Sequence, residues 1–315
     1  LPKVLHEVAG APMLVHAMRA GRALDPKRTI IIAGHGFEAV SAAARAEDPE
    51  VEVVRQEAQL GTGHAVDQAR AALSDFDGTV IVLYGDCPLI QSRTLEELSA
   101  TLSDSAVSVL GFEAKDPARY GRLITDGDKL KRIVEFKDAS PAERAVSLCN
   151  SGVMAASAGL LFDLLSEIDA NNASGELYLT DVIGKAVARG LPCTAVRCAE
   201  RETLGVNSRV ELMQAEKEFQ NLRRAVALED GVSMLAPETV HFSYDTVIGR
   251  DAIIEQNVVF GPGVTVESGA QIRAFSHLEG AHVSRGCIIG PYARLRPGAE
   301  LAENVKIGNF VEIKA

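Results

Sequence analysis

Residues 247–266 read VIGRDAIIEQNVVFGPGVTV, and an apolar residue recurs in this stretch at every sixth position. The period continues almost to the last residue, with a single step of five. The repeated positions are Ile248, Ile254, Phe260, Val266, Ile272, Leu278, Val283, Ile289, Leu295, Leu301, Ile307 and Ile313. Three such hexads make one triangular coil of a parallel β-helix, with each repeated side chain pointing inward. An antiparallel sandwich would instead need alternation with a period of two, so the pattern favours the β-helix.

Residues 12–205 have a different pattern, in which short β-branched runs alternate with helical segments. The expected strands, each read as buried on both faces, are 29–33, 51–54, 79–84 and 106–110. The expected helices are 13–24, 63–73 and 94–102. This alternation predicts right-handed crossovers and a mainly parallel, doubly wound sheet, in which ligands bind beyond the carboxyl ends of the strands.

A long helical pattern separates the two regions. Ser208 and Glu211 have the spacing of a capping box at its start, and a stripe of apolar residues follows. We therefore expect an α/β first domain over 1–206, a connecting helix over 207–232 and an incomplete β-helix over 233–315.

The composition excludes several classes of protein. The 315 residues are 47% hydrophobic and carry a formal net charge of −11, which argues against a general nucleic-acid or anionic-lipid partner. Five scattered Cys without a CxxC pair argue against a disulfide framework or a zinc ribbon. No apolar run reaches the roughly 18 residues of a membrane span. The expected location is the reducing cytoplasm.

The stretch VLYGDCPLI, residues 82–90, is the strongest candidate for chemistry. An apolar strand ends at Tyr84-Gly85 and then presents Asp86 where an α/β site is expected. A carboxylate there suits Mg²⁺ and, through it, phosphate oxygens. The competing interpretation is that Asp86 only caps a turn before Pro88.

The stretch QEAQLGTGHA, residues 56–65, places Gly-Thr-Gly at the start of a helix. Bare backbone there can approach an anion or a planar base, and the Gln56 amide can pair with a base edge. Most such triplets are simple turns. His64 reads as a packing or capping residue because no nucleophile is arranged with it.

Further polar groups stand beside a Gly or at a strand end. Glu135, in IVEFKDA, interrupts an apolar run and is suited to accept sugar hydroxyls, although an exposed strand face also explains it. Asn207, in GVNSR, either caps the long helix or supplies a metal oxygen.

Taken together, nine motifs resemble those of the bifunctional GlmU family, the bacterial N-acetylglucosamine-1-phosphate uridyltransferases. In chain order they are LPKVLHEVAG, QLGTGHA, LYGDCPLI, YGRLI, IVEFKDA, NSGVM, GELYLTDVI, GVNSR and GPYARLRPGAEL. The resemblance implies a Rossmann-like domain that joins UTP to N-acetylglucosamine 1-phosphate, giving UDP-N-acetylglucosamine and pyrophosphate. It also implies a left-handed β-helix that acetylates glucosamine 1-phosphate from acetyl-CoA and forms a homotrimer.

The resemblance further assigns roles to single residues. Asp86 and Asn207 would hold the catalytic Mg²⁺, and Lys3 would neutralise phosphate charge. The other assignments are Gln56, Gly61 and Thr62 for the uracil; Tyr84, Gly121, Glu135 and Asn150 for the N-acetylglucosaminyl group; and Arg296 and Lys314 for the phosphate of the acetyl acceptor.

The chain departs from the family pattern at both ends. The family's first strand and its Gly-rich loop would lie just before Leu1, and the coils with the acetyltransfer His would follow Ala315. We therefore expect a longer parent protein, and no acetyl transfer by these 315 residues. Two alternatives stay open: a nucleotidyltransferase for another sugar 1-phosphate, and a non-catalytic sugar-nucleotide-binding subunit.

Overall fold

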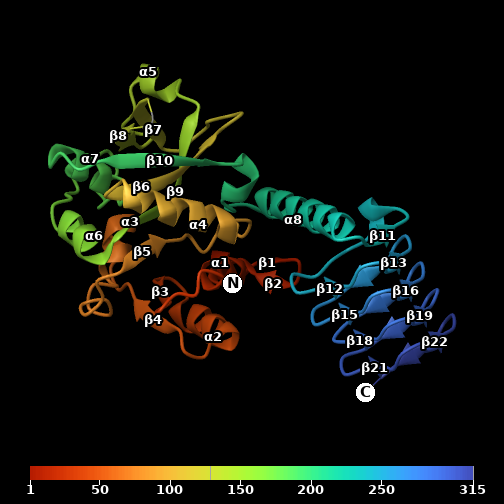
Figure 1. The fold of residues 1–315 in the computed structure, drawn as a ribbon. Coiled ribbons are helices and arrows are strands. Elements are labelled where there is room, and N and C mark those ends of the chain that lie inside the picture. The colour runs from red at the N-terminus through yellow and green to blue at the C-terminus, as the bar shows by residue number, and fades with distance from the viewer. Residues whose placement is uncertain (128, 315) are drawn as a thin grey trace. The chain divides into compact units, whose positions relative to one another are not determined.

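The computed structural model describes residues 1–127 and 129–314, which divide into two compact units (Figure 1). The first unit contains residues 1–6 and 12–207, and the second contains residues 7–11 and 208–315. Residues 7–11, predicted from the sequence to belong to the first domain, thus pack with the second unit. Within the described residues, no helix is both long and apolar enough to cross a membrane.

The first unit is built on two sheets. A pair of parallel strands, β3 (Ile30–Ala33) and β4 (Glu52–Arg55), forms one of them. The order of the six-stranded sheet is β5 (Thr79–Val82), β9 (Leu148–Ser157), β6 (Val107–Glu113), β10 (Cys193–Cys198), β8 (Lys129–Val134) and β7 (Arg122–Asp126).

The larger sheet is mixed, which corrects the expectation of a mostly parallel one. β10 pairs parallel with β6, but β9 runs antiparallel between β5 and β6, and β8 is antiparallel to both β7 and β10. β5, β6 and β10 nevertheless share one direction. The Rossmann-like strand direction is therefore kept, while the long strand β9 returns through the sheet.

Burial also differs from the expectation for the early strands. β6 is buried along almost its whole length, whereas β3, β4 and β5 are only partly buried. β5 lies at the edge of its sheet, and β3 and β4 have only each other as partners among the described strands. A strand with one neighbour keeps part of its surface in water.

Helices pack around these strands. Those of the first unit are α1 (Met13–Arg22), α2 (Phe37–Glu47), α3 (Thr62–Asp67), α4 (Ser92–Ala100), α5 (Pro141–Arg144), α6 (Ala158–Leu165) and α7 (Asp181–Ala188), with one-turn 3₁₀ helices η1 (Lys3–Leu5), η2 (Thr101–Ser103) and η3 (Glu200–Thr203). The helix expected over 63–73 ends at Asp67 and continues as turns.

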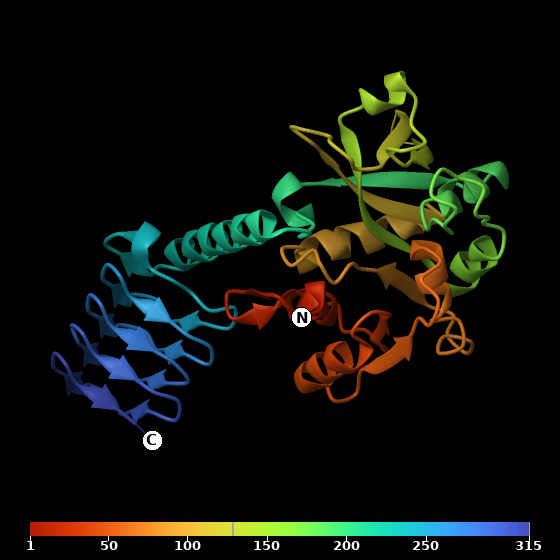
Figure 2. The same ribbon diagram turned by 180° about the vertical axis from the view of Figure 1, so that it is seen from behind.

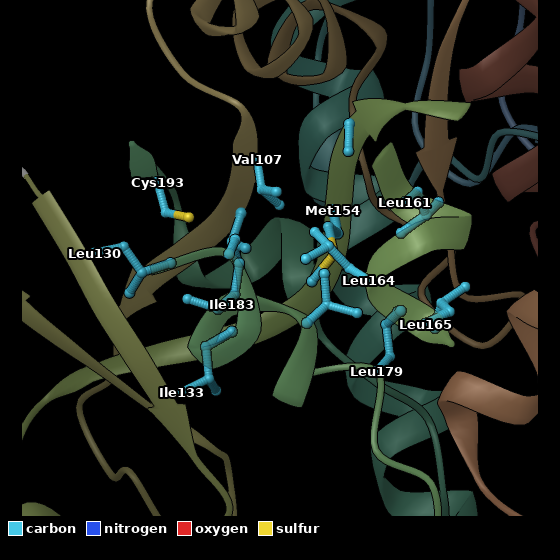
Figure 3. Packing of buried hydrophobic residues seen from close by; sticks show 14 of the residues in the cluster. Val107, Leu130, Ile133, Met154, Leu161, Leu164, Leu165, Leu179, Ile183 and Cys193 are labelled. Carbon is cyan, nitrogen blue, oxygen red and sulfur yellow. The ribbon is translucent and has the colours of Figure 1, made fainter. Parts of the chain in front are cut away.

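The main core of the first unit lies between the six-stranded sheet and helices α6 and α7 (Figure 3). Met154 of β9 points toward Leu161 and Leu164 of α6, all three almost inaccessible to water. Burying each such side chain contributes about 1.5–3 kcal/mol. This packing fixes the strands whose ends carry the candidate site.

The second unit is a parallel β-helix, stacked coil on coil (Figures 1 and 2). β11 pairs with β13, and from β12 onward each strand pairs in parallel with the strand three places later in the chain. The three resulting sheets have the orders β11-β13-β16-β19-β22, β12-β15-β18-β21 and β14-β17-β20-β23. The strands are β11 (Ser233–Met234), β12 (Val247–Ile248), β13 (Ile253–Ile254), β14 (Val259–Phe260), β15 (Thr265–Val266), β16 (Gln271–Ile272), β17 (His277–Leu278), β18 (His282–Val283), β19 (Ile288–Ile289), β20 (Arg294–Leu295), β21 (Glu300–Leu301), β22 (Lys306–Ile307) and β23 (Glu312–Ile313).

The period of six is confirmed residue by residue. Each repeated apolar position is the second residue of a strand, and most are fully buried. The exceptions, Ile248, Ile307 and Ile313, are partly exposed because their strands end their sheets and have a neighbouring coil on one side only. Helix α8 (Arg209–Glu229) precedes the coils, and the Ser208 hydroxyl accepts a hydrogen bond from the Glu211 N–H at its start.

Candidate functional site

Three polar side chains from distant parts of the sequence meet in the first unit. The Lys3 ammonium donates to Asp86 Oδ2 at 2.5 Å and to Asn207 Oδ1 at 2.8 Å. The Lys3 side chain is 46% exposed and that of Asp86 is 18% exposed, so the cluster is open to solvent on the Lys3 side. A carboxylate and an amide oxygen thus converge on one positive charge.

The local folding explains why these groups meet. Leu5, two residues after Lys3, is buried in a cluster with Leu14 and Met18, which anchors η1. Gly85 permits the close approach, because a Cβ there would lie 3.3 Å from Leu14 Cδ1 and 3.4 Å from Val4.

A backbone hydrogen bond fixes the segment that follows strand β10. The Val206 N–H donates to the Asp86 carbonyl at 3.0 Å and thereby ties the segment before Asn207 to the turn after β5. Both segments follow strands that point the same way in the sheet, β5 and β10, so the cluster lies beyond their carboxyl ends, as expected for an α/β sheet.

The donor set fits a hard divalent cation. Mg²⁺ prefers oxygen ligands and is commonly held by one or two protein oxygens together with substrate phosphates. Asp86 and Asn207 offer two such oxygens, and the Lys3 ammonium already lies between them as a cation. In the described part of the chain, His, Cys, Asp and Glu form no group of three or more that would hold a metal by itself.

A second set of residues lies at the start of α3. Gln56, directly after β4, places its Nε2 3.3 Å from the Gly61 carbonyl oxygen and 3.0 Å from His64 Nδ1. Gly61 has φ of +117°, and a Cβ on it would lie 2.5 Å from the Leu177 carbonyl oxygen. Only glycine fits this position.

Thr62 connects this region to the next. Its hydroxyl accepts from the Leu179 N–H at 3.0 Å and also hydrogen-bonds the Tyr84 hydroxyl. Tyr84 lies two residues before Asp86 and packs against Gly152, where a Cβ would lie 2.6 Å from the ring. The predicted residues near the base and near the sugar are thus in direct contact with each other.

The remaining predicted residues of the first unit, Gly121, Glu135 and Asn150, are linked by hydrogen bonds and close contacts. Glu135 Oε1 accepts from the Thr180 hydroxyl at 3.2 Å, and a Cβ on Gly121 would lie 3.3 Å from Glu135 Oε2. The Asn150 N–H donates to the Gly121 carbonyl at 2.9 Å, and Asn150 Oδ1 accepts from the Gly152 N–H at 3.0 Å.

The electrostatics of this network favour neutral donors and exclude a thiolate. Burial, followed by the nearby Glu135 charge, raises the pKa of Tyr84 to about 12, so its hydroxyl keeps its proton at neutral pH. Burial is also the main cause that raises the pKa of the Glu135 carboxyl. Burial and the neighbouring Asp86 raise the pKa of the Cys87 thiol, which therefore offers no nucleophile.

In the second unit, Arg296 and Lys314 approach the same carboxylate. Arg296 Nη1 lies 3.4 Å from Glu312 Oε1, and Lys314 Nζ lies 3.9 Å from Glu312 Oε2. The β-helix register brings Arg294 beside Glu312 as well. Two exposed cations thus flank one anion on adjacent coils.

Two further contacts near the first site are visible only in the fold. Thr180 belongs to the quoted motif GELYLTDVI, but its contact with Glu135 requires the fold. His64, predicted to be a packing or capping residue, contacts two amide side chains, those of Gln56 and Gln68. Its spacing from Gln56 was visible in the sequence, yet only the turn at Gly61 brings them together.

Comparison with known families agrees with this architecture. The MobA-like NTP transferase domain matches residues 2–160, and the bacterial transferase hexapeptide (six repeats) matches residues 280–315. Among solved structures, a UDP-glucose pyrophosphorylase complexed with UDP-glucose covers 71% of this chain and 92% of its own, with a TM-score of 0.56 and 16% identity. The inositol-1-phosphate CTP transferase from T. maritima covers 69% and 88%, with a TM-score of 0.53 and 15% identity. These structures share the fold.

Curated relatives match over the whole chain. The bifunctional protein GlmU of Roseobacter denitrificans is 60% identical, with all of this chain aligned to 70% of the relative. The protein of the same name from Ruegeria pomeroyi is 64% identical over the same shares. Identity at this level over the whole chain shows that the chain belongs to the bifunctional GlmU family.

Proposed function

We propose that the first unit transfers a uridylyl group from UTP to N-acetylglucosamine 1-phosphate, giving UDP-N-acetylglucosamine and pyrophosphate. One observation carries this proposal: Asp86 and Asn207 oxygens converge on the Lys3 ammonium beside the network of Thr62, Tyr84 and Glu135. That arrangement offers cation-assisted phosphate binding next to side chains with hydroxyl and carboxyl groups.

The reaction needs alignment and charge neutralisation more than acid–base chemistry. The phosphate of the sugar substrate is already anionic at neutral pH and attacks the α-phosphorus in line, with pyrophosphate leaving on the opposite side. Lys3 neutralises charge on the phosphates as it accumulates. Asp86 and Asn207 would hold Mg²⁺, which when bound supplies further neutralisation of phosphate charge.

The other residues would bind the two ends of the nucleotide sugar. Gln56 would recognise the uracil edge, and the bare backbone of Gly61 would let the base approach closely. Glu135 and Asn150 would bind the N-acetylglucosaminyl group through its hydroxyl and amide groups. Tyr84, protonated at neutral pH, would donate a hydrogen bond on the same side.

A substrate panel tests the proposal. Pyrophosphate release is measured with UTP, Mg²⁺ and either N-acetylglucosamine 1-phosphate or glucose 1-phosphate. We expect the N-acetylated substrate to be preferred by at least about tenfold in kcat/KM, because a site that pairs with the acetamido group leaves polar groups unpaired without it. Preference for glucose 1-phosphate would contradict the substrate assignment, and binding without turnover would favour a non-catalytic role.

A second function is favoured by the cations on the β-helix. We infer that Arg296 and Lys314 bind the phosphate of glucosamine 1-phosphate as part of a site that the longer parent protein completes, with acetyl-CoA as the acetyl donor and a homotrimer formed through the coils. Glu312 would hold the two side chains in place until the phosphate arrives. Uridylyl transfer, and acetyl transfer by the parent, would serve sugar-nucleotide synthesis in the cytoplasm. Loss of glucosamine 1-phosphate binding in Arg296→Ala, measured by calorimetry, tests this assignment, and unchanged binding would contradict it.

A further inference from the structure

We propose that His64 is a positioning residue that turns the Gln56 amide so that its oxygen faces the nucleotide base, and that it thereby selects uracil over cytosine. The inference rests on the proposed function, in which Gln56 reads the base. It assigns to His64 an effect on nucleotide choice that acts through Gln56 and not through contact with the reacting atoms.

The two hydrogens of the Gln56 amide are both used within the protein. Nε2 lies 3.3 Å from the Gly61 carbonyl oxygen and 3.0 Å from His64 Nδ1. An amide nitrogen has two hydrogens, so these two acceptors occupy it fully. The group left to meet a ligand is Oε1, which only accepts. Without His64, the Gly61 carbonyl alone would hold the nitrogen, and the amide could turn to suit another base.

The framework that carries both acceptors is rigid. The Gly63 N–H donates to the Leu177 carbonyl at 2.8 Å, and the Leu177 N–H donates to the Leu60 carbonyl at 2.8 Å. Gly63 is buried, and a Cβ there would lie 2.4 Å from Ile168 Cδ1. The Gly61 carbonyl and the His64 ring are therefore held in place before any nucleotide binds, as preorganised recognition requires.

An acceptor in this position discriminates between pyrimidines. Uracil carries a hydrogen on N3 and can donate it to Gln56 Oε1, whereas N3 of cytosine is an acceptor and would face Oε1 lone pair to lone pair. Two acceptors left facing each other away from water are unfavourable because neither is hydrogen-bonded. CTP should therefore bind less well than UTP for a reason that depends on the amide orientation.

Proton balance on the imidazole defines the required tautomer. A neutral ring has one N–H and one acceptor nitrogen, yet both ring nitrogens contact amides: Nδ1 lies 3.0 Å from Gln56 Nε2, and Nε2 lies 3.2 Å from the Gln68 amide nitrogen. The Gln56 contact is the shorter, which assigns the acceptor to Nδ1 and the hydrogen to Nε2. To present its oxygen to Nε2–H, the Gln68 amide would give up the hydrogen bond that its nitrogen donates to the His64 carbonyl oxygen at 3.2 Å.

Nucleotide binding tests the effect on selectivity. Dissociation constants of UTP and CTP, measured by calorimetry with Mg²⁺ for the full chain, give a CTP-to-UTP ratio for each variant. We expect His64→Ala to lower this ratio about tenfold. His277→Ala, which removes an exposed histidine of the β-helix, should keep it within about twofold. Because the ratio is internal to each protein, a general loss of folded material cancels. An unchanged ratio in His64→Ala, or an equal fall in His277→Ala, would overturn the proposal.

The tautomer gives a readout that needs no nucleotide. Nitrogen-15 NMR of the imidazole distinguishes a bare Nδ1 from a protonated one, and we expect a bare Nδ1 in the wild-type chain. A hydrogen on Nδ1 would require Gln56 to present its oxygen to the ring and would overturn the assignment. Failure of the proposed uridylyl transfer would appear instead as absent pyrophosphate release, whatever the tautomer.

Discussion

The β-helix and the nucleotide-binding unit place their important residues in opposite ways. In the β-helix, the burial of a side chain depends on its position within a hexad. Ile272 and Leu295 each occupy the repeated apolar position, and both are fully buried. In the first unit, Lys3, Asp86 and Asn207 share no period, and 83 and 204 positions separate Lys3 from its two partners. One region is built by repetition, the other by strand ends and turns that meet.

The two regions are therefore sensitive to different substitutions. A repeated position contributes mainly packing, so its loss should appear in the free energy of unfolding. A residue at a strand end contributes little packing and much chemistry, so its loss should appear in turnover. Substitutions chosen from the two regions therefore test whether stability and activity separate in this way.

The largest expected effect is that of Asp86→Ala. Removing the carboxylate takes away one proposed metal oxygen and leaves the Lys3 ammonium without its 2.5 Å partner. We expect Mg²⁺-dependent pyrophosphate release to fall by roughly 10⁴-fold, equivalent to about 5 kcal/mol of transition-state stabilisation. Steady-state kinetics measure this, with thermal unfolding as a check on folding.

Asp77→Asn is the matched control for this substitution, because Asp77 is an exposed residue just before β5. It should leave turnover within about twofold, as surface substitutions usually do. Turnover of Asp86→Ala equal to that of the control would remove Asp86 from the catalytic site.

The next effect is on stability. Ile272→Ala opens a cavity in a coil where the side chain is fully buried between neighbouring coils, and we expect the free energy of unfolding to fall by about 2–5 kcal/mol. Urea denaturation measures the change. Val247→Ala, at a position 57% exposed and just before a repeated residue, should change it by less than about 0.5 kcal/mol. Equal losses at both positions would contradict the inward and outward assignment.

An intermediate effect is expected from Gly152→Ala, which joins packing and chemistry. Gly152 has φ of +88°, and the added Cβ would lie 2.6 Å from the Tyr84 ring, so the ring must shift. We expect a loss of about 1–3 kcal/mol in the free energy of unfolding and a higher KM for the sugar phosphate. Gly159→Ala on α6 is the control, since nothing lies within 4 Å of its Cβ. No change in KM would separate Tyr84 from the sugar site.

The sequence predicted the β-helix more closely than the sheet for a physical reason. A period of six follows from local chain geometry, so each inward residue of the coils was predictable. The antiparallel insertion of β9 between β5 and β6 depends on contacts more than 40 residues apart, as between Val107 and Ala156, and no local pattern encodes it. The position of β5 at the edge of the six-stranded sheet, which leaves it partly exposed, is likewise a property of the assembled sheet.

The candidate site was predictable to the extent that it lies in motifs. Asp86 follows an apolar strand and a turn glycine, and that context pointed to it without the fold. The partnership of Lys3 with both Asp86 and Asn207 was not expected, because the resemblance gave the residues separate roles. The contact between Thr180 and Glu135 joins residues 45 positions apart, so it forms only in the folded chain and could not be predicted from the order of residues.

The smallest expected effect is that of Glu135→Gln, and it has opposite signs for stability and activity. Burial raises the pKa of Glu135, so the folded state binds its proton more tightly than the unfolded state. The carboxyl therefore favours folding at low pH, and this contribution is lost as the pH rises through the pKa of the folded state.

Glutamine stays neutral, so the Glu135→Gln variant should be more stable than the wild type at pH 7 and less sensitive to pH above 4.5. Its KM for the sugar phosphate should rise about tenfold, because an amide replaces one of the two carboxyl oxygens that would meet the sugar hydroxyls. Chemical denaturation across pH and steady-state kinetics measure the two effects, with exposed Glu96→Gln as the control that should change neither. A variant that lost stability at pH 7 would show that the Thr180 hydrogen bond outweighs the cost of burying the charge.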